Sequence, residues 1–169
     1  MQVKLKISIV TSLLLLFSIC KGQTTKAIYP TEKFSVIEAK LADGKPVIGS
    51  VNLAYKTYDK KKEYRWCLTL NIALELKNVT GNGLPSKAES DVANKFEDEL
   101  LKHLKAVTIT HYIGHLYNDG FLDVYVYLEH PEKANQYLQS QTNNDKITRP
   151  IAFKIEEDPT WNNVKFLLK

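Results

Sequence analysis

Two histidines of one expected strand, His111 and His115, are the first side chains in this sequence that could carry out acid–base or metal chemistry. Positions four apart in a strand share a face but lie about 13 Å apart, at ~3.3 Å per residue. One metal ion held at about 2.1 Å by each imidazole cannot bridge that distance without a strong bend. Asp123, in the next expected strand, could pair with either histidine across a hairpin. Because such pairs serve structure more often than catalysis, a small envelope hydrolase using a His–Asp pair is the alternative interpretation.

Other constellations give no better case for an enzyme. The acidic run Glu156-Glu157-Asp158 lacks the spacing of a calcium loop. Gly81-Asn82-Gly83 lacks the length and the lysine of a phosphate-binding loop, and no serine has the context of a nucleophile elbow. A single cysteine in the folded domain, Cys67, cannot close an internal disulfide, and we interpret it as a small buried hydrophobe. We therefore predict no catalytic residue, no metal and no cofactor.

A tyrosine-rich strand face is the strongest candidate for binding. Residues 121–128 alternate between an aliphatic set and a set that contains two tyrosines and an aspartate, so the two sets point to opposite faces of a sheet. The polar side of residues 64–74 would lie beside the tyrosines. The candidate binding residues are Arg65, Cys67, Asn71, His115, Asp123, Tyr125 and Tyr127. Alternatively, the N-terminal hairpin or the segment around Trp161 packs over this face.

Residues 1–22 have the order of a secretory signal peptide: a basic segment, an apolar run over residues 7–19, then small and polar residues. The apolar run is shorter than the ~20 residues that a membrane-spanning helix needs. Cleavage between Gly22 and Gln23 is favoured over lipidation of Cys20, because the residues before Cys20 do not suit a lipidated cysteine. We predict a periplasmic or secreted bacterial protein with no transmembrane helix; a lipoprotein anchored at Cys20 is the less favoured alternative.

Removal of residues 1–22 takes away three of the 23 basic residues and none of the 19 acidic ones, so the net charge falls from +4 to +1. A near-neutral chain has no electrostatic reason to bind nucleic acid. The remaining length suits one domain with its own core. We predict a single domain over residues 34–169, preceded by a loose leader over residues 23–33.

Alternating apolar residues and turn signals predict six strands. Residues 64–74 alternate most cleanly, and Asp43-Gly44 and Asn118-Asp119-Gly120 are typical of hairpin turns. The expected strands are residues 34–41, 46–55, 64–74, 106–117, 121–129 and 150–156.

Two helices are expected between these strands. Ser86 and Glu89 have the spacing of a capping box, and Pro131 suits the first turn of a second helix that reaches about residue 141. Glu89 belongs to the polar side of the first helix and is expected to face solvent. The apolar stripe of that helix is Val92, Ala93, Phe96, Leu100 and Leu104.

From residue 64 onward the expected order is strand, helix, strand, strand, helix, strand. This is the βαββαβ order of a ferredoxin-like α+β sandwich. We predict a mainly antiparallel sheet with two helices on one face, plus an N-terminal β-hairpin that extends or covers it. Leu68, Phe96 and Val124 should then meet in one interior.

Five segments follow one another in an order that spans most of the chain after residue 22. They are Gly83-Leu84-Pro85, Phe96–Leu100, Tyr112–His115, Gly120–Tyr127 and Glu157–Trp161. Together they resemble a bacterial domain of unknown function that is sometimes found beside a domain similar to the protein inhibitor of ribonuclease E. That neighbour implies a ribonuclease-related role by association alone, and an export signal would remove this chain from cytoplasmic ribonuclease. The resemblance implies no catalytic residues.

These observations favour an exported, non-enzymatic binding or interaction module over the hydrolase. Its partner would be a protein, a peptide or a glycan, and a homo-oligomer formed through the tyrosine face is a further alternative. Residue types and spacing identify neither the ligand nor the physiological process.

Overall fold

The computed structural model describes residues 28–169, which form six strands and two long helices with short 3₁₀ segments between them. The predicted signal peptide, residues 1–22, and the first part of the predicted leader lie outside the described residues. The strands are β1 (Phe34–Lys40), β2 (Pro46–Asn52), β3 (Trp66–Ala73), β4 (Thr110–Asn118), β5 (Phe121–Leu128) and β6 (Ile151–Glu157). The helices are α1 (Lys87–Val107) and α2 (Pro131–Thr142).

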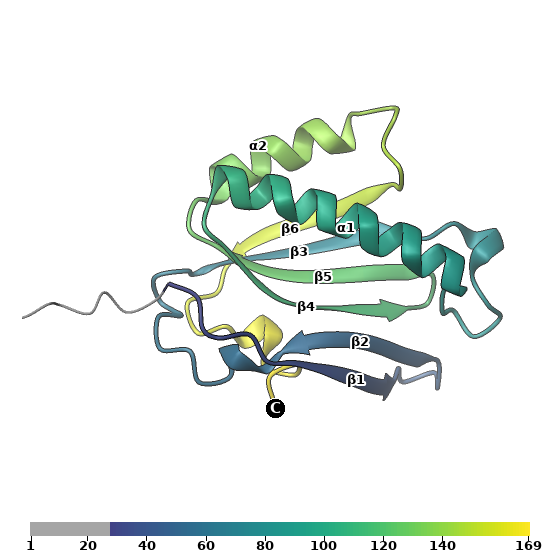
Figure 1. Ribbon diagram of the computed structural model, residues 1–169, viewed down its shortest axis with the longest axis horizontal. Coiled ribbons are helices and arrows are strands. Elements are labelled where there is room, and N and C mark those ends of the chain that lie inside the picture. The colour runs from purple at the N-terminus through teal and green to yellow at the C-terminus, as the bar shows by residue number, and fades with distance from the viewer. Residues whose placement is uncertain (1–27) are drawn as a thin grey trace, which may run out of the picture.

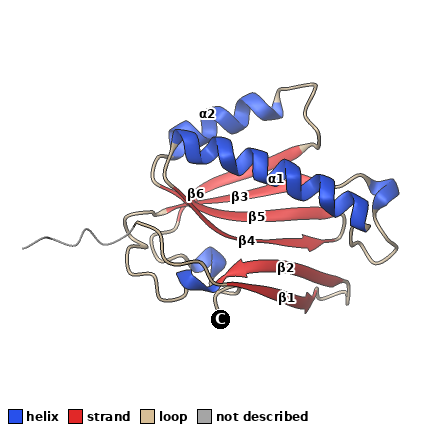
Figure 2. Ribbon diagram, in the orientation of Figure 1, coloured by secondary structure: helices blue, strands red, loops and turns tan. Residues whose placement is uncertain are grey.

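One antiparallel six-stranded sheet organises the described residues, with the strand order β1-β2-β4-β5-β3-β6. Both helices lie on the same side of it (Figures 1 and 2). The hairpin β1–β2 extends the sheet beside β4 and does not cover it, which decides between the two arrangements that the sequence left open. The predicted α+β class, with an antiparallel sheet and two helices, is confirmed.

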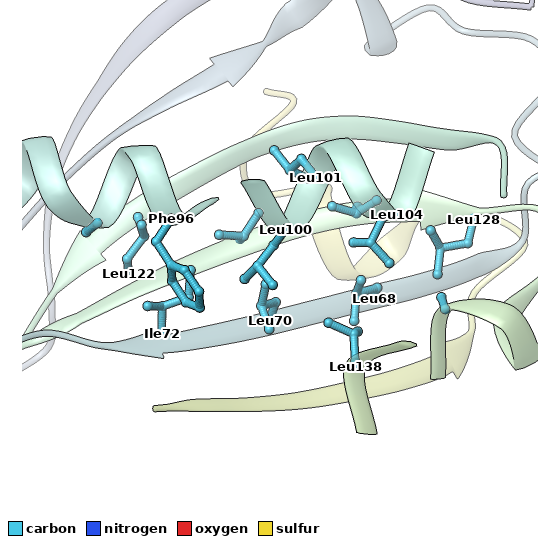
Figure 3. Close-up of a cluster of buried hydrophobic side chains, with 14 of the residues drawn as sticks. Leu68, Leu70, Ile72, Phe96, Leu100, Leu101, Leu104, Leu122, Leu128 and Leu138 are labelled. Atoms are coloured by element: carbon cyan, nitrogen blue, oxygen red, sulfur yellow. The ribbon is translucent and has the colours of Figure 1, made fainter. Parts of the chain in front are cut away.

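The aliphatic core lies between the helices and the sheet (Figure 3). Leu68 of β3, Phe96 of α1 and Val124 of β5 all belong to it and are at most 6% exposed, so the predicted common interior is confirmed. Full burial of each such side chain stabilises the fold by about 1.5–3 kcal/mol. Val92, at the start of the predicted stripe, is instead 39% exposed.

The N-terminus of α1 differs from the prediction at Glu89. Ser86 caps the helix as predicted, since its Oγ accepts a hydrogen bond from the N–H of Glu89 at 3.3 Å. The Glu89 side chain is fully buried, however, and accepts hydrogen bonds at 2.8 Å from both Nε and Nη2 of Arg149. It also accepts from the N–H of Glu75 at 2.9 Å. The expectation that Glu89 faces solvent was wrong because its partner comes from the distant segment that precedes β6.

A second core covers the opposite face of the sheet. Tyr127 of β5 and Cys67 of β3 belong to it, together with Trp161 from the C-terminal segment, residues 158–169, which follows β6. The Trp161 ring stacks on Tyr127 with 3.9 Å between ring centroids, and its Nε1 donates to the carbonyl of Tyr64 at 2.9 Å. The segment around Trp161 therefore packs over part of the tyrosine face, as one of the two sequence interpretations held.

Candidate functional site

The buried part of the tyrosine face binds the C-terminal segment to the sheet. Tyr127 is fully buried and donates its hydroxyl to Asp158 Oδ2 at 2.6 Å. Asp158 also accepts the backbone N–H groups of Asn162 and Asn163, at 2.9 and 2.8 Å, which holds the C-terminal segment on the sheet. Cys67 is 1% exposed, and burial raises the pKa of its thiol, which disfavours the nucleophilic thiolate.

A β-bulge in β4 decides where the two histidines point. The register between β4 and β5 shifts between Tyr112 and Gly114, so Ile113 is an extra residue in β4. His111 therefore points into the second core, whereas His115 lies on the helix side. The expectation that His111 and His115 share a face was wrong, because one extra residue reverses the alternation beyond it.

His115 pairs with a glutamate, and not with Asp123, which the alternative interpretation paired with either His111 or His115. Its Nδ1 lies 2.8 Å from Glu97 Oε2 and 3.0 Å from the Tyr112 hydroxyl. Glu97 is 3% exposed, and its Oε1 has no hydrogen-bond partner. Asp123 lies on the other face, opposite Leu116 of β4. Burial, together with the charge of Glu97, raises the pKa of Tyr112, so its hydroxyl stays protonated.

A cavity of about 340 Å³ opens on the face opposite the helices, between the β1–β2 hairpin and the C-terminal segment. Most of its wall is apolar. Ile37 and Ala39 of β1, Leu116 of β4, and Phe166 and Leu167 of the C-terminal segment contribute to it. The end of the chain lies beside β1 and β2 in Figure 1. The part of the tyrosine face that the C-terminal segment leaves open is therefore a hollow.

Two predicted residues line this cavity, and a third, Asn71, is hydrogen-bonded to one of them. The carboxylate of Asp123 lines it and accepts hydrogen bonds at 2.7 Å from the side-chain amides of Asn71 and Asn118. Tyr125 lines it as well, with its ring edge-on to Phe166 at 5.8 Å between centroids. Burial, and secondarily the charge of Asp123, raises the pKa of Tyr125 to about 12, so this hydroxyl is neutral at pH 7. Within residues 28–169, Asp123 makes no ion pair.

The remaining predicted residue, Arg65, lies away from the cavity. It pairs with Glu157 at 3.0 Å, and both side chains are half exposed. An exposed pair of this kind contributes little to stability. The structure therefore brings together Asn71, Asp123 and Tyr125, and separates them from Arg65 and His115.

Sequence reasoning missed an aromatic cluster around His111. Its imidazole is fully buried, Nδ1 lies 3.2 Å from the Tyr55 hydroxyl, and Nε2 has no hydrogen-bond partner. Burial lowers the pKa of His111 to about 4, so it is neutral at pH 7. Five aromatic rings have their centroids 4.1–6.2 Å from the centroid of the His111 ring. They belong to Tyr29, Tyr55, Tyr58, Tyr64 and Trp161. Tyr55, Tyr58 and Tyr64 are near one another in the sequence, but Tyr29, His111 and Trp161 are far from them, so no local pattern predicts the cluster.

Over residues 28–169, no three or more histidine, cysteine, aspartate or glutamate side chains are grouped so that they could hold a metal ion. In the same range, neither helix is long and apolar enough to cross a membrane.

Comparison with known proteins identifies a family without an assigned activity. The model of a family of unknown function, DUF695, matches residues 37–168. This match covers well over half of the chain, so the protein belongs to that family. None of the curated proteins or solved structures matches the chain significantly.

Proposed function

We propose that this DUF695 protein is an exported, non-enzymatic binding module whose ligand enters the cavity between the hairpin and the C-terminal segment. The observation that supports it is the cavity of about 340 Å³, whose lining is largely apolar and includes the carboxylate of Asp123. Ligand pockets generally combine apolar walls with a few polar groups that fix orientation. The signal-peptide order of residues 1–22 supports a periplasmic or secreted location.

We further assign residues 66–157 to a ferredoxin-like sandwich. The inner strand order β4-β5-β3-β6, antiparallel throughout, supports this assignment. The hairpin would then be an addition at the β4 edge. In this interpretation the addition creates the cavity, since β1 supplies part of a wall that the four inner strands lack.

Phe166 offers a direct test because it lines the cavity and is still 49% exposed. The purified mature chain would be used to select from a phage library of random dodecapeptides. We expect enriched peptides to bind the wild type and to lose at least about tenfold in affinity for Phe166→Asp, because a charge would enter the apolar wall. Leu76→Asp is the matched control, since Leu76 is 77% exposed and lies outside the cavity. The proposal fails if no peptide is enriched, or if both variants bind equally well.

One observation favours a hydrolase as the competing function. The His115–Glu97 pair orients an imidazole, and Ser50 of β2 is the cross-strand partner of His115 and carries a hydroxyl. Hydrolysis of p-nitrophenyl acetate by wild type, His115→Gln and the exposed control His103→Gln would distinguish the two functions. The binding module predicts equal rates for all three proteins. Loss of hydrolysis in His115→Gln alone would favour the hydrolase.

A further inference from the structure

β1 ends the sheet, and its outer edge pairs with no strand among residues 28–169. Just outside its two ends, the carbonyl of Lys33 and the N–H of Leu41 make backbone hydrogen bonds toward the β2 side. In an antiparallel ladder, successive residues alternate between facing the partner strand and facing away from it. The backbone groups of Val36 and Glu38 therefore point away from β2, toward solvent.

Within residues 28–169, the first half of this edge lacks the usual protection against strand pairing. Proteins blunt exposed edges with charges, prolines, bulges or covering segments. Phe34-Ser35-Val36-Ile37 contains no charge and no proline, and β1 pairs with β2 without a register shift. Val36 is 70% exposed and Phe34 is 48% exposed. Among residues 28–169, no strand pairs with this half of the edge, and apolar side chains flank its unpaired backbone groups. An extended chain could pair with these backbone groups.

The cavity begins at this same edge. Ile37 and Ala39 line it from β1, so alternate side chains of a strand added beside β1 would lie at its open side. Asp123 supplies a negative charge that no ion pair within the described residues neutralises. Lys40 of β1 lines the cavity as well, so the lining carries one charge of each sign. Charge complementarity therefore favours a segment that presents a basic side chain to Asp123 and an acidic one to Lys40, beside an apolar side chain on the cavity face.

We propose that β1 is a docking edge to which an extended segment of a partner protein adds as a seventh strand. On its cavity face that segment carries an apolar, a basic and an acidic side chain at alternate positions. In this binding mode the main-chain hydrogen bonds provide affinity, and pockets for alternate side chains provide specificity. The inference rests on the proposed function, because the cavity is the pocket that it uses.

Val36 separates backbone docking from side-chain contact. Val36→Pro removes an N–H that points to solvent and leaves the hydrogen bonds to β2 in place, and edge strands accept proline at such positions. Val36→Ala is the matched control, because it shortens the same side chain and keeps the N–H. With the dodecapeptides selected on the wild type as probes, we expect Val36→Pro to weaken binding at least about tenfold relative to Val36→Ala.

Modified peptides test the same contact without altering the protein. Selected peptides would be N-methylated at alternate residues, in two versions that block opposite edges of the strand. We expect one version to bind like the parent peptide and the other to lose binding. This measurement decides the question if Val36→Pro does not fold, as its melting temperature would reveal.

Three outcomes would overturn strand addition. In the first, Val36→Pro and Val36→Ala bind the peptides equally; if Phe166→Asp still abolishes binding, the cavity proposal remains. In the second, both N-methylated versions bind like the parent peptide. In the third, light scattering shows a wild-type dimer that Val36→Pro converts to a monomer, so a second copy occupies the edge.

Discussion

At the residue scale, Gly114 allows β4 to form its bulge and to pair closely with β2. It follows the extra residue of the bulge, has φ +156°, and a Cβ built on it would lie 2.2 Å from the carbonyl oxygen of Ser50 in β2. Any side chain would push the hairpin away from β4. Only a residue without a Cβ allows the bulge and the β2–β4 pairing together.

We therefore predict that Gly114→Ala destabilises the fold by about 2 kcal/mol or more, because backbone strain and a backbone clash combine. Urea unfolding measures the change in the free energy of unfolding. Gly81→Ala is the control, since no atom lies within 4 Å of a Cβ built at Gly81 and its φ is not positive. Similar losses in the two variants would contradict this role of the bulge.

His111 should make stability depend on pH. Its pKa is about 4 in the folded protein, against an ordinary value near 6.5. The unfolded chain therefore binds more protons between those values, and stability decreases as pH falls from about 6.5 toward 4, by about 3 kcal/mol in total. Urea unfolding at pH 7 and pH 4.5 should show a larger loss in the wild type than in His111→Phe. Equal losses would contradict the buried neutral histidine.

At the scale of elements, one buried ion pair connects segments that lie far apart in the sequence. Glu89 in the first turn of α1 holds Arg149, which precedes β6, and also the N–H of Glu75 after β3. Hydrogen bonds from Arg149, opposed by burial, lower the pKa of Glu89 to about 2. This stabilisation is present above the ordinary pKa near 4.5 and is lost as pH falls toward 2.

Arg149→Met should destabilise the protein by about 3 kcal/mol at pH 7, because it leaves a buried carboxylate without its cation. The control is Lys87→Met, which breaks an exposed pair with Asp91 on the first turns of the same helix. We expect less than about 0.5 kcal/mol for that control. Thermal and urea unfolding measure both variants, and a loss below about 1 kcal/mol in Arg149→Met would argue against the connection.

At the scale of the whole molecule, we predict that residues 1–22 are removed before the protein acts. Intact-mass measurement of the protein from its native host should give a chain that begins at Gln23. A mass that begins at Cys20 and includes acyl chains would mean a membrane-anchored lipoprotein. A chain that retains Met1 would contradict export.

Much of the architecture could be predicted from the sequence, because strand and helix periods are local. β3 and β5 alternate cleanly, and α1 carries its cap at Ser86. The largest boundary difference is near residues 106–109, where α1 continues to Val107 and β4 begins only at Thr110. The expected apolar faces of β3, β5 and α1 pack together in one core.

The candidate site was predicted only in part. Asn71, Asp123 and Tyr125 were predicted from their alternation; Asp123 and Tyr125 do line a cavity, and Asn71 donates a hydrogen bond to Asp123. The walls of that cavity come from β1 and from Phe166 and Leu167, segments far apart in the chain, so no local period could place them. The extra residue in β4 likewise shows only in the pairing of β4 with β5. It turns the side chain of His115 to the helix side of the sheet, where it contacts Glu97.

The amino-acid sequence alone determined the order of the elements, the aliphatic side of the sheet and the signal-peptide pattern, because each depends on neighbours within a few residues. Tertiary structure alone decided that Trp161 covers Tyr127, that Arg149 buries Glu89, and that a hollow remains beside Asp123. Those outcomes depend on which distant side chains satisfy a buried polar group or fill a space. Contacts of that kind form only when segments distant in the sequence come together in the folded protein.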